Sequence, residues 1–169
     1  GDWFDAAVAY RDWARREATG LWGPIAMESE PIEFVETDYY ESTMGSGLVT
    51  RFWAFEELID PARLPEIKHQ TNAWEAAYAK LGAHGEPLPL NLDPGYLTPA
   101  KLVLASTKDH AHRIYLRDGI YAEVTLLYQA RRWQPRDWTY PNYRRPDVQQ
   151  FLTAGRAFLQ TRLRSGPVE

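Results

Sequence analysis

A histidine and a glutamate beside a tight turn are the residues of this chain best placed for proton transfer. Asp118-Gly119 predicts a two-residue hairpin turn, because both positions of such a turn take positive φ angles. In that register His112 and Glu123 are diagonal neighbours on one face. A carboxylate beside an imidazole can orient it as a general base. We therefore take His112 and Glu123 as candidate catalytic residues, with a structural hydrogen-bonded pair as the alternative.

The same register distributes the remaining side chains of the hairpin over two faces. It pairs Arg117 with Ile120, Leu116 with Tyr121, Ile114 with Glu123 and His112 with Thr125. One face then holds His110, His112, Ile114, Glu123 and Thr125, and the other holds Arg113, Tyr115, Ala122 and Val124.

A metal at the histidine-glutamate pair would need further ligands. The chain has no cysteine, so a metal would have to use histidines and carboxylates. Asp38 or Asp93 could supply the third ligand. The sequence leaves the cofactor unknown, with a divalent metal as one possibility.

A polar, glycine-containing loop is the second candidate site. Residues 37–47 contain Asp38, the adjacent phenols Tyr39 and Tyr40, and two glycines whose backbone amides could approach an anion. The spacings GxxxxGK[ST] and GxGxxG are both absent, so the signal for a nucleotide is weak. The alternative is a strand connection whose tyrosines cover the edge of the core.

Arginines and aromatic residues alternate in the third candidate, residues 130–145. Guanidinium groups bind phosphates, and indole or phenol rings stack on bases, so Tyr140 and Arg144 are candidate ligand contacts. The chain as a whole is acidic, with a pI near 5.6, which favours a small phosphorylated ligand over a polynucleotide. A solvated or acid-paired loop is the alternative.

A fourth candidate joins Asn91-Leu92-Asp93-Pro94-Gly95-Tyr96 to Ser106-Thr107-Lys108. Asp93 could act as a base and Lys108 could hold an anion, although Asp-Pro-Gly is also an ordinary turn. The GxSxG and HExxH motifs are absent, so the sequence does not support the standard hydrolase and zincin mechanisms.

Composition indicates one globular domain over residues 1–169. The chain is 44% hydrophobic and 25% charged, with a formal net charge of −4. Between Glu28 and Asp60 the chain has nine acidic residues and one basic residue, Arg51. Between Arg131 and Arg164 it has eight arginines and two acidic residues. These segments either face each other or are both solvated. We expect neither a membrane span nor a signal peptide, and place the protein in the cytoplasm by default.

Patterns of apolar and turn residues predict the elements that position these candidates. We expect helices over 3–19 ending at Gly20, from Asp60 to about Leu81 and from Pro146, and a short one from Thr98-Pro99. Strands are predicted within 25–35, over 48–58, over 90–92 and in the hairpin, with a turn at 93–95 and a proline-broken loop before Pro146. The fold class is α+β: a two-layer, mostly antiparallel or mixed sheet with about three helices packed on it.

Five ordered strings relate the chain to a known family. They are TDYYxxxMG, FEELIDPxxLPEIK, NLDPGYLTPAKLVLASTK, HRIYLRDGIYAEVTLLY and QPRDWTYPNYR. Over about residues 20–155 the chain resembles the bacterial domain-of-unknown-function family DUF4416. Some members are described as GTP-binding proteins, but no GTPase motif is present here and no activity carries over. The resemblance implies a short apolar strand before the first helix, and leaves open whether that strand is missing.

Residues in these strings make up the candidate ligand-binding set. They are Asp38, Tyr39, Tyr40, Asp93, Lys108, Arg113, Tyr140 and Arg144. We expect a small anionic or phosphorylated metabolite, such as a nucleotide, to bind in a cleft with the histidine-glutamate pair. A noncatalytic module that docks on protein or RNA through residues 130–145 is the alternative. The sequence leaves catalysis and oligomeric state open.

Overall fold

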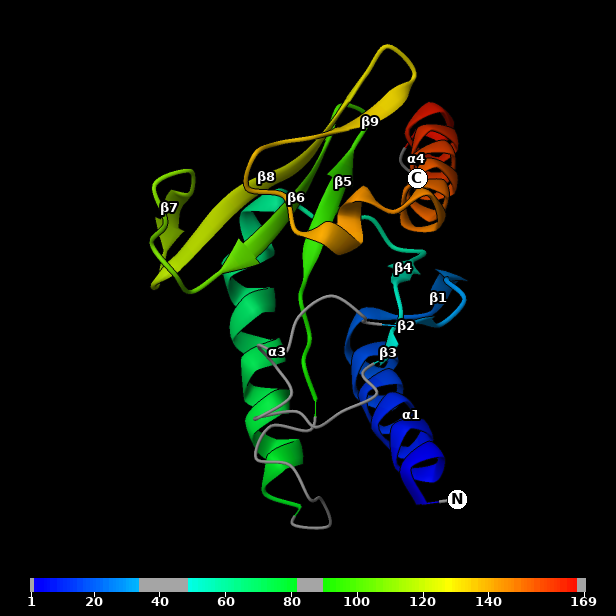
Figure 1. The fold of residues 1–169 in the computed structure, drawn as a ribbon, viewed down its shortest axis with the longest axis vertical. Helices are drawn as coiled ribbons and strands as arrows, with labels where there is room; N and C mark the ends of the chain where they lie inside the picture. Colours follow the sequence, from blue (N-terminus) through cyan, green and yellow to red (C-terminus); the bar gives the residue numbers. More distant parts are fainter. Residues whose placement is uncertain (1, 34–48, 82–89, 167–169) are drawn as a thin grey trace. The chain divides into compact units, whose positions relative to one another are not determined.

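The computed structural model describes residues 2–33, 49–81 and 90–166, with side chains from residue 11 onward (Figure 1). These ranges confirm an α+β fold, with three α-helices and strands that pair only in antiparallel ladders. The chain divides into two compact units, residues 1–58 with 70–92 and residues 59–69 with 93–169. The single-domain assignment stays a prediction.

Two short ladders and helix α1 (Asp2–Trp22) belong to the first unit. Strand β1 (Ile25–Glu28) pairs with β4 (Trp53–Phe55), and β2 (Ile32–Glu33) pairs with β3 (Val49–Thr50). The strand predicted over 48–58 is therefore wrong as one element. It breaks at Phe52, whose carbonyl accepts from the amide of the loop residue Ser29 and whose amide donates to the Ser29 hydroxyl.

Helix α1 ends later than the sequence predicted. Gly20 lies inside it, and Gly23 follows its end with a φ of 83° and an amide that donates to the Thr19 carbonyl at 3.0 Å. A helix tolerates an exposed glycine at a modest cost, whereas a positive φ favours one strongly. The ring of Trp22 beyond Gly20 packs on Trp74 of α3 (Leu64–Ala79), with ring centroids 4.9 Å apart, which favours the longer helix.

Acidic Glu28 has basic partners within this unit. Its carboxylate accepts from Arg15 of α1 and, at 3.1 Å, from the Trp53 indole, and Arg51 lies 3.8 Å away. Burial raises the pKa of Glu28, but these hydrogen bonds and the charges of Arg15 and Arg51 outweigh it and hold the pKa below its ordinary value. This acid of the 28–60 segment is thus paired locally.

A five-stranded antiparallel sheet forms the second unit. The strands are β5 (Gly95–Thr98), β6 (Lys101–Ser106), β7 (Ile114–Arg117), β8 (Ile120–Gln129) and β9 (Arg132–Pro135). Their order is β5-β6-β8-β7, and β9 also pairs with β8. The long strand β8 is rich in β-branched and aromatic residues, and it is the strand that holds β6, β7 and β9 together.

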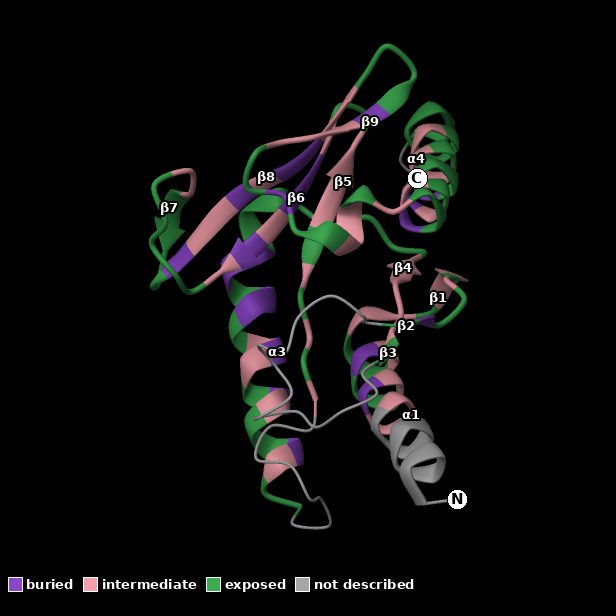
Figure 2. Ribbon diagram, viewed as in Figure 1, coloured by how far each residue is buried: buried purple, intermediate pink, exposed green. Residues whose placement is uncertain are grey.

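The start of helix α3 (Leu64–Ala79) covers one face of this sheet. A single 3-10 turn (Pro61–Arg63), capped by Asp60, leads into it, and Pro65 lies in its first turn as predicted. Leu64 and Ile120 are fully buried, and they pack with Val103 and Ala105. Figure 2 shows buried stretches in purple on α3 and β8. Helix α4 (Pro146–Ser165) begins at the predicted proline and contacts β5, where Gly155 approaches Leu97.

Three local predictions before the hairpin are wrong. Residues 90–92 form no strand, and Gly95 begins β5 instead of ending a turn. The helix expected from Thr98-Pro99 is the turn between β5 and β6, in which the Thr98 hydroxyl accepts from the Ala100 amide at 3.1 Å. A capping threonine followed by proline suits a β-turn as well as a helix start, so the signal was ambiguous.

The predicted proline-broken loop before α4 contains an unexpected strand. The hairpin between β8 and β9 turns at Ala130 and Arg131, whose φ angles are 52° and 59°. Neither residue is a usual one for positive φ, so the turn had no sequence signal. A 3-10 helix (Pro141–Arg144) follows and leads into α4.

Candidate functional site

The hairpin of β7 and β8 closes as predicted and then departs from the predicted register. Asp118 and Gly119 have φ angles of 53° and 76°, and Arg117 pairs with Ile120. The ladder shifts between Tyr115 and Arg117, so that Tyr115 pairs with Tyr121 and Ile114 with Ala122. The three other predicted pairs, Leu116–Tyr121, Ile114–Glu123 and His112–Thr125, are wrong because a bulge at Leu116 inserts one residue.

The carboxylate of Glu123 is the centre of a buried polar cluster. Its Oε1 atom accepts from His112 Nε2 at 2.6 Å and from Arg113 Nε at 3.1 Å. Its Oε2 atom accepts from the hydroxyl of Thr125 at 2.9 Å, two residues along β8. Glu123 is 3% exposed. The predicted contact between His112 and Glu123 is confirmed, although by a turn before β7 and not by strand pairing.

Arg113 joins the cluster and was placed on the wrong face by the sequence. It lies before the start of β7, so strand alternation does not govern it. Besides Glu123, its guanidinium donates to the Ser106 hydroxyl at 2.9 Å and to the Lys108 carbonyl at 3.2 Å. Its side chain is only 5% exposed. Arg113 therefore balances the charge of Glu123 inside the cluster.

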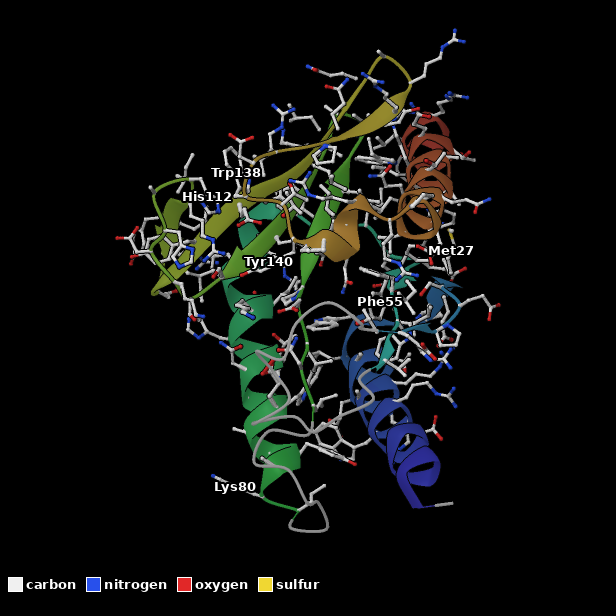
Figure 3. All side chains as sticks on the ribbon, in the orientation of Figure 1. Met27, Phe55, Lys80, His112, Trp138 and Tyr140 are labelled. Atoms are coloured by element: carbon white, nitrogen blue, oxygen red, sulfur yellow. The ribbon has the colours of Figure 1, made fainter. Side chains whose placement is uncertain are left out.

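The imidazole of His112 lies between two other rings. Trp138 stacks on it with centroids 4.8 Å apart and an interplanar angle of 13°, and His110 approaches it edge-on at 5.9 Å. Figure 3 labels His112 and Trp138, which lie close together. An ionised carboxylate only accepts hydrogen bonds, so Nε2 carries the proton facing Glu123. In the neutral ring Nδ1 is then an acceptor, and no hydrogen bond from the described residues reaches it.

A network of hydrogen bonds fixes the segment that carries Trp138. The indole donates to the Val124 carbonyl at 2.9 Å, and the Thr139 hydroxyl donates to the Thr125 carbonyl at 2.6 Å. Arg144 donates to the carbonyls of Thr139 and Arg136. The sequence missed Trp138 and Thr139 as members of the site. The available signal was an aromatic residue beside a threonine in the QPRDWTYPNYR string.

Arginines of the 130–145 segment are largely engaged within the chain. Arg144 donates to two carbonyls, Arg136 donates to the Pro135 carbonyl, and Arg145 pairs with Asp147. The hydrogen bond from Arg145 lowers the pKa of Asp147. These contacts use donors that a phosphate backbone would need. The docking role of the segment stays a prediction with less support.

The other predicted ligand contacts are dispersed. Asp38, Tyr39 and Tyr40 lie outside the described residues. Asp93 pairs with Lys68 of α3 at 3.8 Å, Lys108 is exposed beside the cluster, and Tyr140 is 51% exposed just after Thr139. Roles of these residues, and of Arg113 and Arg144, in binding a ligand stay predictions.

Metal ligands do not converge in the described ranges. No three His, Asp or Glu side chains there are arranged to hold a metal ion, so Asp93 does not complete a site with His112 and Glu123. A cleft of about 330 Å³ lies in the first unit, and none of the predicted site residues lines it. Its lining residues are Arg16, Glu17, Gly20, Leu21, Gln70 and Trp74. Among the helices described, none has the length and apolarity of a membrane span.

Fold and cluster together define an α+β protein whose antiparallel sheet carries a buried Glu-His-Arg cluster under a tryptophan. The chain belongs to the family described as domain of unknown function DUF4416, whose model matches residues 4–158. No curated protein and no solved structure matches it.

Proposed function

We propose that the chain binds a small anionic or phosphorylated metabolite, with nucleotides among the candidates, at the cluster around His112, in the cytoplasm of a bacterial cell. The observation that carries the proposal is the 2.6 Å contact that holds His112 Nε2 against the buried Glu123. Nδ1 is then the ring nitrogen that can contact a ligand. His112 has a side chain 20% exposed, which is enough for one edge of the ring to meet a ligand.

Charges around the cluster support an anionic ligand. Glu123 and Arg113 carry opposite formal charges and pair inside the protein, so Glu123 is not an unpaired acid beside a ligand. Exposed Lys108 and His110 precede it, with Asp109 as the acid between them. The positive charge of Lys108 would attract an anion to this part of the surface, because opposite charges stabilise each other.

The chemistry of the pair is acceptance of a proton. A ligand hydroxyl or a protonated phosphate donates to Nδ1, and the imidazolium that forms keeps its Nε2 proton directed at Glu123. With a reactive ligand, the same arrangement is that of a general base and its orienting carboxylate. Glu123 would then act through His112 and would not touch the ligand.

A thermal-shift screen tests the proposal. Inorganic phosphate, nucleoside monophosphates and sugar phosphates are added to the wild-type chain and to His112→Ala, because a ligand bound only to the native state raises Tm. We expect one class to raise the Tm of the wild type and not of His112→Ala.

The matched control is His69→Ala, which removes a histidine from α3 whose Nε2 contacts the Asp118 carbonyl. It should keep the ligand-dependent shift. A shift that survives in His112→Ala, or the lack of any shift with these probes, contradicts the proposal. A salt titration separates it from the RNA-docking alternative, because multiple phosphate contacts weaken steeply with salt.

A further inference from the structure

We infer that Trp138 is a positioning residue for His112, and that the segment from Arg136 to Arg144 serves to hold Trp138 in place. The inference rests on the proposed function only in taking His112 as the working residue. It gives the QPRDWTYPNYR string a role inside the site, where the sequence had suggested contact with a ligand.

One hydrogen bond does not fix an imidazole. The contact between Nε2 and Glu123 sets the position of one ring atom but leaves the ring plane able to rotate about that contact. The parallel indole of Trp138 removes this freedom, because any large rotation would drive the ring into the indole 4.8 Å away. Carboxylate and indole thus define the position and the plane of the ring together.

Both restraints originate from adjacent residues of one strand. Glu123 holds Nε2 with its side chain, and the carbonyl of Val124 accepts from the Trp138 indole at 2.9 Å. Strand β8 is paired with β6 along this stretch, so the two anchors are rigid relative to each other. Strand β8 therefore determines both the position and the plane of the His112 imidazole.

Arg144 forms hydrogen bonds with backbone carbonyls on both sides of Trp138. Its Nε donates to the Thr139 carbonyl at 3.1 Å, and a terminal nitrogen donates to the Arg136 carbonyl at 2.6 Å. The Thr139 hydroxyl accepts from the Arg136 amide at 2.8 Å and also donates to the Thr125 carbonyl. A planar guanidinium can bridge two carbonyls in this way, whereas the point charge of a lysine cannot do so with the same geometry.

Ligand access follows from this packing. Trp138 covers one face of the imidazole, and Glu123 occupies the Nε2 edge. A ligand must therefore reach Nδ1 close to the plane of the ring. Loss of Trp138 would release the ring plane, so that the imidazole would hold its hydrogen bond to Glu123 for only part of the time and would sample both tautomers.

Long-range ¹H–¹⁵N spectra of the full chain at neutral pH test this inference, because ring ¹⁵N shifts report the tautomer of each histidine. In the wild type we expect His112 to show one tautomer with the proton on Nε2. In Trp138→Ala and in Arg144→Lys, the ¹⁵N shifts of the His112 ring should be averages over the two tautomers. Trp138→Phe should restore part of the wild-type pattern, because phenylalanine keeps a flat ring at this position.

Arg63→Lys is the matched control, since the Arg63 side chain pairs with the exposed Glu66 of α3. If Trp138→Ala unfolds the chain, Arg144→Lys and Trp138→Phe still decide. Wild-type tautomer shifts retained in a folded Trp138→Ala or in Arg144→Lys would overturn the inference. No ligand is needed, so failure of ligand binding to His112 leaves this result independent.

Discussion

His112 Nε2 lies 2.6 Å from Glu123 Oε1, although the two residues are not paired across any ladder of the described sheet. The contact forms because the chain before β7 turns back over the face of β8 that carries Glu123 and Thr125. Arg113 follows the same turn and reaches the same oxygen. A buried carboxylate is thereby supplied with three donors.

Removal of the carboxylate charge should destabilise the fold strongly. Glu123→Ala leaves the guanidinium of Arg113 buried without its counter-charge, which costs about 3–5 kcal/mol for pairs of this kind. Urea unfolding followed by tryptophan fluorescence measures the change. Glu66→Gln, which breaks an exposed pair with Arg63, is the control and should cost less than about 1 kcal/mol. Equal losses in the two variants would mean that Glu123 is not the centre of the cluster.

Two glycines at the end of α1 should respond in opposite directions to alanine. Gly23→Ala meets a φ of 83° and a new Cβ 3.3 Å from the Glu57 carboxyl carbon, so a loss of roughly 1–2 kcal/mol is expected. Gly20→Ala adds a Cβ with no atom within 4 Å inside the helix and should gain about 0.5–1 kcal/mol. Thermal unfolding of both variants tests the helix end. A destabilised Gly20→Ala would show that α1 stops where the sequence first suggested.

Acid should weaken the fold partly through Glu28. Its pKa in the folded protein is lowered by hydrogen bonds from Trp53 and Arg15 and by the charges of Arg15 and Arg51, against an opposing effect of burial. A lowered pKa contributes stability above the unfolded-state pKa, and this stability is lost as the pH falls through the folded-state value. Glu28→Gln should therefore lose less stability than the wild type between pH 6 and pH 3 in urea titrations. If the free energy of unfolding changed with pH in the same way in both proteins, Glu28 would not contribute to the loss of stability in acid.

Sequence predicted the histidine-glutamate contact from one strong local signal. Asp118-Gly119 fixes the turn and returns the chain along β8, which brings the segment before β7 close to Glu123 although His112 itself lies outside the strand. The bulge at Leu116 was not predictable, because it depends on the twist of the paired strands and has no residue signature here. The face of Arg113 was wrong because this residue lies before the start of β7, where strand alternation does not apply.

Other parts of the site were hidden by ambiguous composition. Trp138 stands among arginines, a pattern that also suits binding of nucleic acid, and only the three-dimensional contacts show that Arg144 donates to backbone carbonyls. Strand β6 was missed because Thr98-Pro99 begins turns as readily as helices. Helix α4 was predicted well because Pro146 suits its first turn and the buried residues Val148 and Leu152 recur at helical spacing, so local propensity and burial agree there.

The central claim is that His112 Nδ1 receives the ligand. The most direct test is the ring ¹⁵N spectrum of the full chain while the phosphorylated compound with the largest thermal shift is added. We predict that the chemical shift of His112 Nδ1 changes with ligand concentration until it saturates. The chemical shifts of the His69 ring nitrogens should stay unchanged. A ligand that raises Tm but leaves His112 Nδ1 unmoved would contradict the account.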